Sequence, residues 1–186
     1  MKNIRKGLRP VLVSLLLLSL ICGVLYTGAI TGFANLFLAK QANGSIITVT
    51  LKDGTRKEIG SALIAQKFTE TTYMIGRPTG DTNLSPLSEA YKAVVESRVK
   101  WWQAFDPTNT NALPAELVEA SGSGVDPNIS PAAAEYQVAR IAKARSISEV
   151  SVRNIIKKYT VGRFLGIWGE PAVNVLKVNL ALDGLL

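Results

Sequence analysis

The longest apolar run in the chain contains no charged residue between Arg9 and Lys40. An α-helix rises about 1.5 Å per residue and the hydrocarbon core of a bilayer is about 30 Å thick, so roughly 20 residues are enough to cross it. The stretch from about Val11 to Ala34 therefore predicts one transmembrane helix, within an anchor that spans residues 10–39. Residues 40–186 follow it as one domain, a size typical of a single compact core.

The tail ahead of this run, residues 1–9, has four basic residues and no acidic one, namely Lys2, Arg5, Lys6 and Arg9. Basic residues beside a span favour the cytoplasmic side and attract anionic lipid headgroups. We therefore expect a single-pass protein of the plasma (inner) membrane, with its N-terminus in the cytoplasm and residues 40–186 extracytoplasmic.

Two other interpretations of the apolar run compete with a retained span. A cleaved signal peptide has an apolar core of only about 7–15 residues, which this run exceeds, although Gly32-Phe33-Ala34 leaves one small-x-small site. A lipoprotein anchor at Cys22 would need a small residue before the cysteine, where Ile21 stands. The length of the run favours the retained span.

Short runs of β-branched or alternating residues predict strands near both ends of the domain. Ser45–Leu51 and Thr55–Ile59 flank Asp53-Gly54, which is a hairpin signal. Val173–Leu182 alternates apolar side chains with others, which predicts a long, half-buried strand. We expect this last strand to pair with the strands near residue 50.

The intervening sequence has helical periodicity in three stretches, after a polar linker at Gly80–Pro86. Each stretch opens with a serine that can cap a helix. The predicted helices run from Pro86, after Ser85, to about Ala104; from Pro131, after Ser130, to about Arg145; and from a capping box of Ser146 and Glu149 to Gly162. Strands, helices and a further strand together predict an α+β domain with helices packed on one face of a small sheet.

The net charge of +7 does not indicate a nucleic-acid partner. Four of the 21 basic residues lie in the tail, which leaves 17 against 14 acidic residues in the rest of the chain. That balance is typical of an ordinary solvated surface.

The residue types that are missing exclude several kinds of site. The chain has no histidine, so it has no histidine-containing metal site, Ser-His-Asp triad or Cys-His pair. Its one cysteine, Cys22, lies within the predicted span, so the domain has no internal disulfide. We therefore predict no catalytic residues and no metal ligands.

A GxxxG motif, Gly28 to Gly32, lies within the predicted span. Small residues one turn apart let a second helix approach closely, and Thr27 and Thr31 can add hydrogen bonds between helices. Glycine is also common in transmembrane helices without a partner, so the motif fits both a packing surface and chance.

Three features of the domain suggest local chemistry. The turn Ser121–Gly124 is glycine-rich, but no Gly-Lys-Ser/Thr follows, so it is not a P-loop and fits a flexible connection. Asp126, Gln137 and Arg140 form either a polar cluster or a set of caps and surface residues. Trp168, in a turn bounded by glycine and proline, is either a core plug or a contact residue.

The run from Ser121 to Ala134, continued through Arg140, resembles the signature of the C subunits of Kdp potassium-transporting P-type ATPases. The resemblance covers nearly the whole chain. Further blocks match in order and spacing at Gly60–Gln66, Phe68, Gly76–Pro78, Thr160–Arg163, Gly169–Leu176 and Asn179–Asp183. The chain departs from the family at Asn128, where the family usually has histidine, and in the shortened Gly80–Pro86 stretch, where the family's longer region has been compared with nucleotide-binding signatures.

The resemblance implies an accessory, non-catalytic subunit of a complex that moves potassium inward at the expense of ATP. Its partners would be a channel-like potassium-translocating subunit and a P-type ATP-hydrolysing subunit. The family is described as a catalytic chaperone that raises the ATP affinity of the hydrolysing subunit, so ATP is implied as a ligand. An extracytoplasmic domain opposes direct contact with ATP, which favours a role in assembly and stabilisation.

The family motifs also imply candidate residues for motif structure or partner contact. These are Asp126, Ser130, Gln137, Arg140, Arg163, Trp168, Glu170 and Asn174. Two other functional classes stay open: a membrane-anchored extracytoplasmic binding or sensor domain, and a membrane-tethered enzyme.

Overall fold

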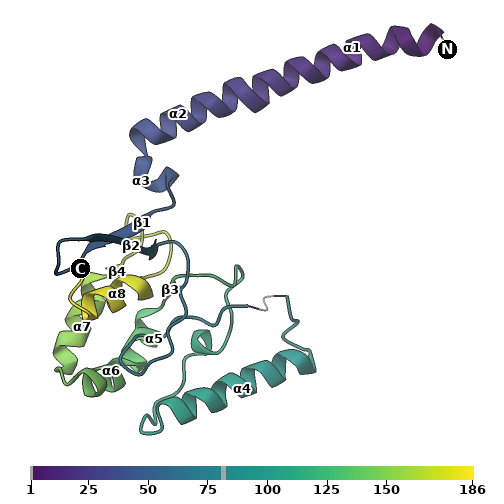
Figure 1. Ribbon diagram of the computed structural model, residues 1–186. Helices are drawn as coiled ribbons and strands as arrows, with labels where there is room; N and C mark the ends of the chain where they lie inside the picture. Colours follow the sequence, from purple (N-terminus) through teal and green to yellow (C-terminus); the bar gives the residue numbers. More distant parts are fainter. Residues whose placement is uncertain (1, 81–82) are drawn as a thin grey trace. The chain divides into compact units, whose positions relative to one another are not determined.

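The computed structural model describes residues 2–80 and 83–186, with the backbone alone for residues 2–6. Residues 81–82 of the predicted Gly80–Pro86 linker lie outside the described part, so that linker is only partly tested. The chain consists of two compact units, Met1–Ile46 and Ile47–Leu186. Figure 1 gives the order of the elements.

The first unit is built on one uninterrupted helical run, α1 (Lys2–Leu18), the π-helical η1 (Ser19–Tyr26) and α2 (Thr27–Phe37). Its apolar part, Gly7–Phe37, has 31 residues and contains an 18-residue stretch with a mean hydropathy of 2.3. The run ends at Leu38, whose φ of −132° leaves the helical region, and a short helix α3 (Ala39–Ala42) follows. The prediction of one long apolar helix, sufficient by length and composition to cross a bilayer, is confirmed.

The predicted hairpin is also confirmed. Strands β1 (Ile46–Thr50) and β2 (Arg56–Ser61) form a two-stranded sheet. The turn closes through a hydrogen bond of 2.8 Å from the Leu51 amide to the Thr55 carbonyl. Gly54 adopts a φ of +82°, a left-handed conformation that glycine tolerates without a side-chain clash.

A second, three-stranded sheet lies at the centre of the domain. Its order is β3 (Asn128–Ile129), β5 (Ala172–Asn174), β4 (Thr160–Val161), and both pairs are antiparallel. Val173 of the central strand is fully buried and pairs with Ile129 on one side and Thr160 on the other. The sheet therefore joins segments of the chain that are far apart in sequence.

Helices complete the α+β domain, as predicted. They are α4 (Glu89–Phe105), the 3-10 turn η2 (Ala115–Leu117), α5 (Pro131–Tyr136), α6 (Val138–Arg145), α7 (Glu149–Lys158) and α8 (Val175–Leu182). The main core includes Met74, Trp102, Val138, Ile141, Val152 and Val173. Burial of such side chains is the dominant favourable term in folding.

The predicted strand Val173–Leu182 is wrong beyond Asn174, because Val175–Leu182 forms helix α8. Its apolar residues divide between two cores. Val175 and Val178 join the main core, whereas Leu176 and Leu180 join a second cluster with Val49 of the hairpin. A helix buried on two faces is apolar at most positions, so alternation in its sequence does not distinguish it from a strand. The expected pairing with the strands near residue 50 is likewise replaced by packing of α8 against them.

Helix ends differ from the prediction in three places. Helix α4 is capped by Ser88 instead of Ser85, and α7 by Ser148 instead of Ser146. Ser146 has a φ of +54° and ends α6. Helix α7 stops before Tyr159, ahead of strand β4, so Gly162 does not close it.

The predicted cap at Ser130 is confirmed, since its hydroxyl accepts a hydrogen bond from the Ala133 amide. The helix that it opens does not run unbroken to Arg145. It is interrupted at Gln137, whose ψ of −7° separates α5 from α6.

Candidate functional site

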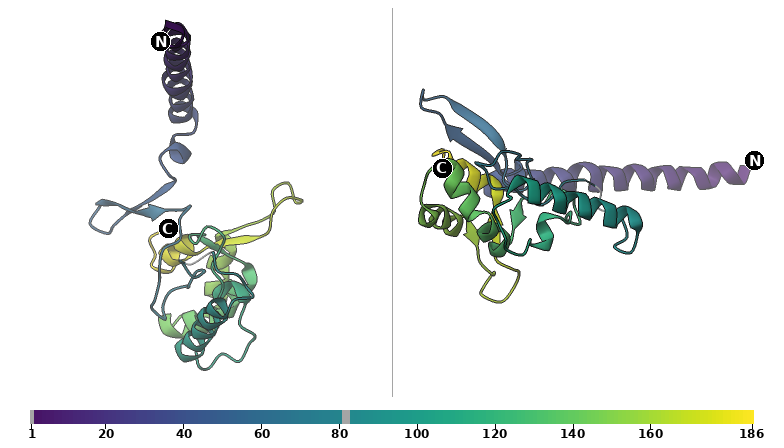
Figure 2. Two further views of the ribbon diagram at one scale, coloured as in Figure 1. Left: turned by 90° about the vertical axis from the view of Figure 1, so that its right-hand side faces the viewer. Right: turned by 90° about the horizontal axis from the view of Figure 1, so that it is seen from below.

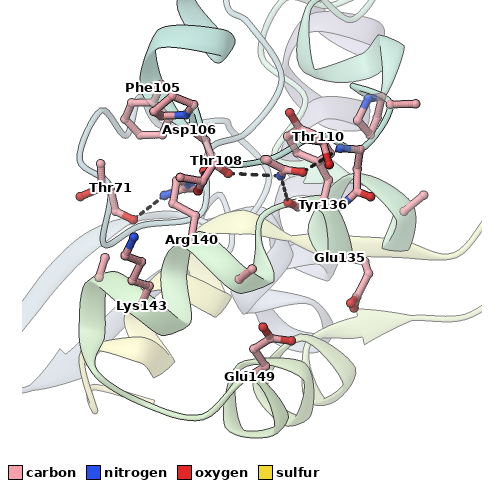
Figure 3. Close-up of a pocket in the computed structure, with 18 of the residues that line it drawn as sticks. Thr71, Phe105, Asp106, Thr108, Thr110, Glu135, Tyr136, Arg140, Lys143 and Glu149 are labelled. Carbon is pink, nitrogen blue, oxygen red and sulfur yellow. Dashed lines mark hydrogen bonds between the residues drawn. The ribbon is translucent and has the colours of Figure 1, made fainter.

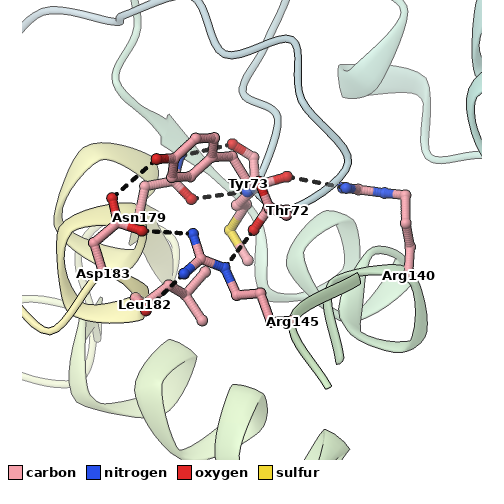
Figure 4. Close-up of polar contacts among 8 residues, drawn as sticks. Thr72, Tyr73, Arg140, Arg145, Asn179, Leu182 and Asp183 are labelled. Atoms are coloured by element: carbon pink, nitrogen blue, oxygen red, sulfur yellow. Dashed lines mark hydrogen bonds and ion pairs between the residues drawn. The ribbon is translucent and has the colours of Figure 1, made fainter. Parts of the chain in front are cut away.

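The segment Thr71–Ile75 begins in a turn, which the Tyr73 amide closes on the Glu70 carbonyl at 3.1 Å. Its backbone is held by side chains of Gln137, between α5 and α6, and of residues on α6 and α8 (Figure 4). Gln137 accepts from the Ile75 amide at 2.8 Å and donates to the Ile75 carbonyl at 2.9 Å. Asn179 of α8 does the same for Met74, at 2.8 and 2.9 Å. Both amide side chains are almost completely buried, so they satisfy backbone groups that have no access to water.

Arg140 holds the same segment through its carbonyl oxygens. Its guanidinium donates to the carbonyls of Thr71 and Tyr73 and, at 2.7 Å, to Gln137 Oε1. The guanidinium also lies 4.8 Å from the centre of the Phe105 ring. Burial lowers the pKa of Arg140 to about 10, so the side chain is charged at neutral pH.

Arg145 ties the segment to the end of α8. It donates to the carbonyls of Thr72 at 2.6 Å and Leu182 at 2.7 Å, and it pairs with Asp183 at 2.7 Å. The hydroxyl of Tyr73 donates to the other oxygen of Asp183 at 3.0 Å. This hydrogen bond to a carboxylate, together with partial burial, raises the pKa of Tyr73.

The family-motif residues around β3 lie at the ends of elements. Asp126 accepts from the Asn128 amide at 2.9 Å, in the turn that leads into β3. Ser130, which caps α5, also donates to the Glu116 carboxylate through its backbone and hydroxyl groups. Asn174 caps α8 by accepting from the Lys177 amide at 3.1 Å. These three residues therefore close turns and helix ends within the domain.

Asn128, which replaces the histidine usual in the family, lies opposite Asn174 in the sheet. The Asn174 side chain donates to the Asn128 side-chain oxygen at 3.4 Å and to the Ala62 carbonyl at 2.9 Å. An amide therefore fits this position as a hydrogen-bond acceptor.

A cavity of about 990 Å³ opens between α5, α6 and the loop that follows α4 (Figure 3). Its charged lining residues are three acids and three bases, Asp106, Glu135, Glu149, Arg140, Lys143 and Arg153. Arg153 pairs with Glu135 at 2.7 Å and with Glu149 at 2.9 Å. The carboxylate of Asp106 accepts from Asn109 at 3.2 Å.

The described residues of this cavity do not fit a nucleoside triphosphate. A triphosphate needs an excess of positive charge or a row of free backbone amides. Here carboxylates match the cations in number, and Arg140 already donates to Thr71, Tyr73 and Gln137.

The glycine-rich turn Ser121–Gly124 is closed by its own backbone, because the Gly124 amide donates to the Ser121 carbonyl.

Metal binding finds no support in the described part of the chain, where no three acidic or cysteine side chains are grouped in a way that could hold an ion.

The loop between β4 and β5 extends away from the rest of the domain (Figure 2). It contains three of the predicted contact candidates, Arg163, Trp168 and Glu170. Arg163 pairs with Glu170 at 3.0 Å across its base, and Trp168 is 61% exposed. Trp168 is therefore at the surface and does not plug the core. Phe164, Leu165 and Ile167 lie beside it and were not predicted, although an uncharged apolar run between Arg163 and Glu170 marks them in the sequence.

The GxxxG motif lies at the start of α2. A Cβ atom added to Gly28 or Gly32 would meet no described atom of this chain within 4 Å. Thr27 uses its hydroxyl inside its own helix, where it donates to the Cys22 carbonyl at 2.8 Å. Packing within the described chain therefore does not require glycine at these two positions.

The family model described as "KdpC: K+-transporting ATPase, c chain" matches residues 8–184. The chain belongs to the KdpC family. The potassium-transporting ATPase KdpC subunit of Listeria monocytogenes is 53% identical over 188 residues, covering 100% of this chain and 99% of the relative. The KdpC subunit of Clostridium perfringens is 45% identical with the same coverage, and that of Methylococcus capsulatus is 46% identical over 95% of this chain and 97% of the relative.

Membership of the KdpC family confirms the resemblance found in the sequence. The matched region includes both the apolar helix Gly7–Phe37 and the domain that follows it. All eight motif candidates lie inside it. The geometry divides them into two groups: those that hold the fold together, and the exposed Arg163, Trp168 and Glu170 of the β4–β5 loop.

Proposed function

We propose that this chain is an accessory subunit of a potassium-transporting P-type ATPase complex and has no catalytic groups of its own. The observation that carries the proposal is the match of about half of all residues, over the full length, to chains named potassium-transporting ATPase KdpC subunit. Its partners are a channel-like subunit that translocates potassium and a P-type subunit that hydrolyses ATP. Potassium is the cargo of the complex.

The role of the chain in that complex is assembly and stabilisation. Its apolar helix spans the membrane, with residues 1–9 in the cytoplasm, and packs on helices of the partner subunits. Support comes from Gly28 and Gly32, where no described part of this chain needs a small residue. Glycines one turn apart allow close helix approach. The extracytoplasmic domain, residues 40–186, caps the potassium entrance.

Any effect of this subunit on ATP affinity is indirect in this proposal. The balanced charges of the 990 Å³ cavity argue against a triphosphate site in the domain. An extracytoplasmic domain is also separated from cytoplasmic ATP by the membrane. The subunit therefore raises ATP affinity by stabilising the assembled state of the hydrolysing subunit.

The packing role is tested by replacing Gly28 and Gly32 with isoleucine in the full complex. Isoleucine side chains separate the two helix backbones, so we expect at least about a ten-fold lower recovery of the complex in mild detergent, which corresponds to about 1.4 kcal/mol. Potassium uptake at low external potassium falls with it. The control, Ala34→Ile, adds bulk on a side of the helix that is turned away from Gly28 and Gly32.

Unchanged recovery and uptake in the glycine variant would refute the packing role. Isolation of the wild-type chain from native membranes without either partner would refute the subunit assignment itself. That second result would favour a membrane-anchored binding or sensor domain acting without the pump.

A further inference from the structure

A second cavity, of about 360 Å³, lies between α4, η2 and two segments without regular structure, residues 66–69 and 75–79. Its described lining contains three cations, Lys67, Arg77 and Arg98, and no carboxylate. None of the three forms an ion pair within the described part of the chain. The cavity therefore carries an excess of positive charge, unlike the 990 Å³ cavity, where carboxylates match the cations.

Both arginines are held in place by one short backbone segment. The Val118 carbonyl accepts from Arg98 at 2.8 Å, and the Ala120 carbonyl accepts from Arg77 at 3.2 Å. Arg77 makes one further, longer contact, of 3.5 Å, to the Glu119 carbonyl. A guanidinium has five N–H donors, so most donors of each side chain are not used by described residues. The two groups are thus oriented in advance and keep donors for a ligand.

Arg77 has a donor that is left unsatisfied. Its Nε atom is buried and has no hydrogen-bond partner in the described part of the chain. Buried donors are almost always paired, so an unpaired one in a native fold indicates a partner that the chain itself does not supply. Because Arg77 lines the cavity, an acceptor oxygen of a bound ligand can be that partner.

The charge of the lining indicates the chemistry of the ligand. A cleft lined by one sign of charge concentrates ions of the opposite sign. A guanidinium binds carboxylates and phosphates through two parallel hydrogen bonds. A carboxylate has only two oxygens, which a single arginine occupies, whereas a phosphate group has enough acceptor oxygens for both arginines and the lysine. Three cations around one cavity therefore favour a phosphate group over a carboxylate.

The remaining walls of the cavity are partly apolar. Ile75, Trp102 and Leu117 are buried, and Trp101 is 42% exposed. Such walls accommodate the organic part of a phosphate ester. The volume lies near the lower end of the range for small-molecule sites, about 300–1,000 Å³, which suits a phosphate with a small substituent. A nucleoside triphosphate is larger, and in the topology proposed above ATP is on the opposite side of the membrane.

We propose that this cavity is a phosphate-binding site, in which the Arg77 and Arg98 guanidinium groups bind the phosphate oxygens and Lys67 adds a third positive charge. The same chemistry is offered by two sources, the phosphate of a phospholipid headgroup and free inorganic phosphate. The site goes beyond the proposed function, because the chain binds phosphate here without any partner subunit.

Titration of the purified full chain in maltoside micelles, which contain no phosphate, tests the site. The two probes are inorganic phosphate and glycerophosphoglycerol, the water-soluble headgroup of phosphatidylglycerol. Tryptophan fluorescence reports binding, because Trp101 lines the cavity and is partly exposed. We expect saturable binding of at least one probe. Tighter binding of glycerophosphoglycerol assigns the site to a lipid headgroup, and tighter binding of inorganic phosphate assigns it to the free ion.

Two variants locate the binding in this cavity. Arg77→Gln with Arg98→Gln removes both guanidinium charges, and we expect the probe to bind at least about ten-fold more weakly. The matched control, Arg56→Gln with Lys57→Gln, removes two exposed charges of β2 outside the cavity and should keep the wild-type affinity.

Arg77 and Arg98 also hold residues 118–120, so a second variant separates binding from folding. Lys67→Glu reverses the charge of an exposed side chain, and we expect a similar loss of affinity with an unchanged thermal unfolding midpoint. Binding of neither probe, or equal affinities of the wild-type and Lys67→Glu chains, would overturn the site.

The same titration of the intact complex tests whether a group of another protein is the natural occupant. We expect the complex to bind the same probe as the isolated chain. A complex that binds neither probe, although the isolated chain does, would show that a partner subunit fills the cavity and would overturn the assignment to phosphate.

Discussion

At the scale of single residues, the domain depends on amide side chains that act as strand partners. Gln137 and Asn179 each pair with both backbone groups of one residue, Ile75 and Met74. A buried backbone group without a partner costs about 1–3 kcal/mol. These two amides therefore stabilise Met74 and Ile75, which lie outside the described strands.

Replacing Gln137 with leucine tests this role. The variant leaves both polar groups of Ile75 buried without the amide, so we expect the free energy of unfolding to fall by about 2–4 kcal/mol. The measurement is denaturant unfolding of the full chain in micelles, followed by tryptophan fluorescence. Gln103→Leu, at an exposed position of α4, is the control and should change stability by less than about 0.5 kcal/mol. A loss of unfolding free energy as small as that of the control would show that the Gln137 contacts are dispensable.

The sequence could name some of these residues but not their partners. A polar cluster of Asp126, Gln137 and Arg140 was one of two interpretations that the sequence left open, and the side chains of Gln137 and Arg140 do meet at 2.7 Å. Asp126 instead bonds to Asn128 in the turn before β3. Asn179 was missed, because a residue in a predicted strand gives no sign that its side chain contacts Met74, 105 positions away. Partners at such separations follow from the tertiary fold and not from local pattern.

At the scale of elements, the region between α6 and α7 contains two serines that compete as the helix cap. Ser148 accepts from the Ser151 amide and caps α7. Ser146 has a φ of +54° and stands in the position at the end of α6 that glycine usually occupies. The local pattern Ser-x-x-Glu at Ser146 and Glu149 therefore predicts the right helix with the wrong cap.

Two substitutions separate these roles. Ser148→Ala removes the cap, and we expect it to lower the free energy of unfolding by about 1 kcal/mol. Ser146→Gly relieves a left-handed conformation, and we expect a gain of about 0.5 kcal/mol. Thermal unfolding of the full chain in micelles measures both. A loss of stability in Ser146→Gly would restore Ser146 as the cap.

The hairpin and three of the helices were predictable because each buries one face, which produces a regular period in the sequence. Helix α8 was not, because Val178 contacts the main core while Leu176 and Leu180 contact the cluster with Val49. A helix with two buried faces is apolar at most positions, so its sequence does not show the 3.6-residue period of a helix with one buried face. The Asn174 cap was the remaining local signal for a helix at this position.

At the scale of the whole molecule, the sidedness of the chain follows in our proposal from charge alone. The tail 1–9 has four basic residues and no acidic residue, and the uncharged run between Arg9 and Lys40 separates it from the domain. Sealed vesicles of known orientation test the assignment. We expect protease to digest the domain only when the extracytoplasmic face is exposed, because the positive-inside rule keeps the tail in the cytoplasm.

A tag on the N-terminal tail is the internal control for this experiment, since it should be cut only in vesicles of the opposite orientation. Digestion of the domain from the cytoplasmic face would reverse the topology. It would also place the domain on the same side of the membrane as ATP, where the two could be in direct contact.

The side-chain clamp on Thr71–Ile75 constrains how the domain can be made. The segment lies early in the domain sequence, whereas several of its partners lie at the end. Asn179 and Leu182 belong to α8, and Asp183, which pairs with Arg145, follows that helix directly. Until synthesis has passed Asp183, Met74 has no amide partner and the hairpin residue Val49 has no Leu176 or Leu180 to cover it. The domain therefore folds after translation of its last helix and not progressively from its N-terminus. Its folding is accordingly a late event. In the topology that we propose, it is completed after most of the polypeptide has been delivered to the extracytoplasmic side of the membrane.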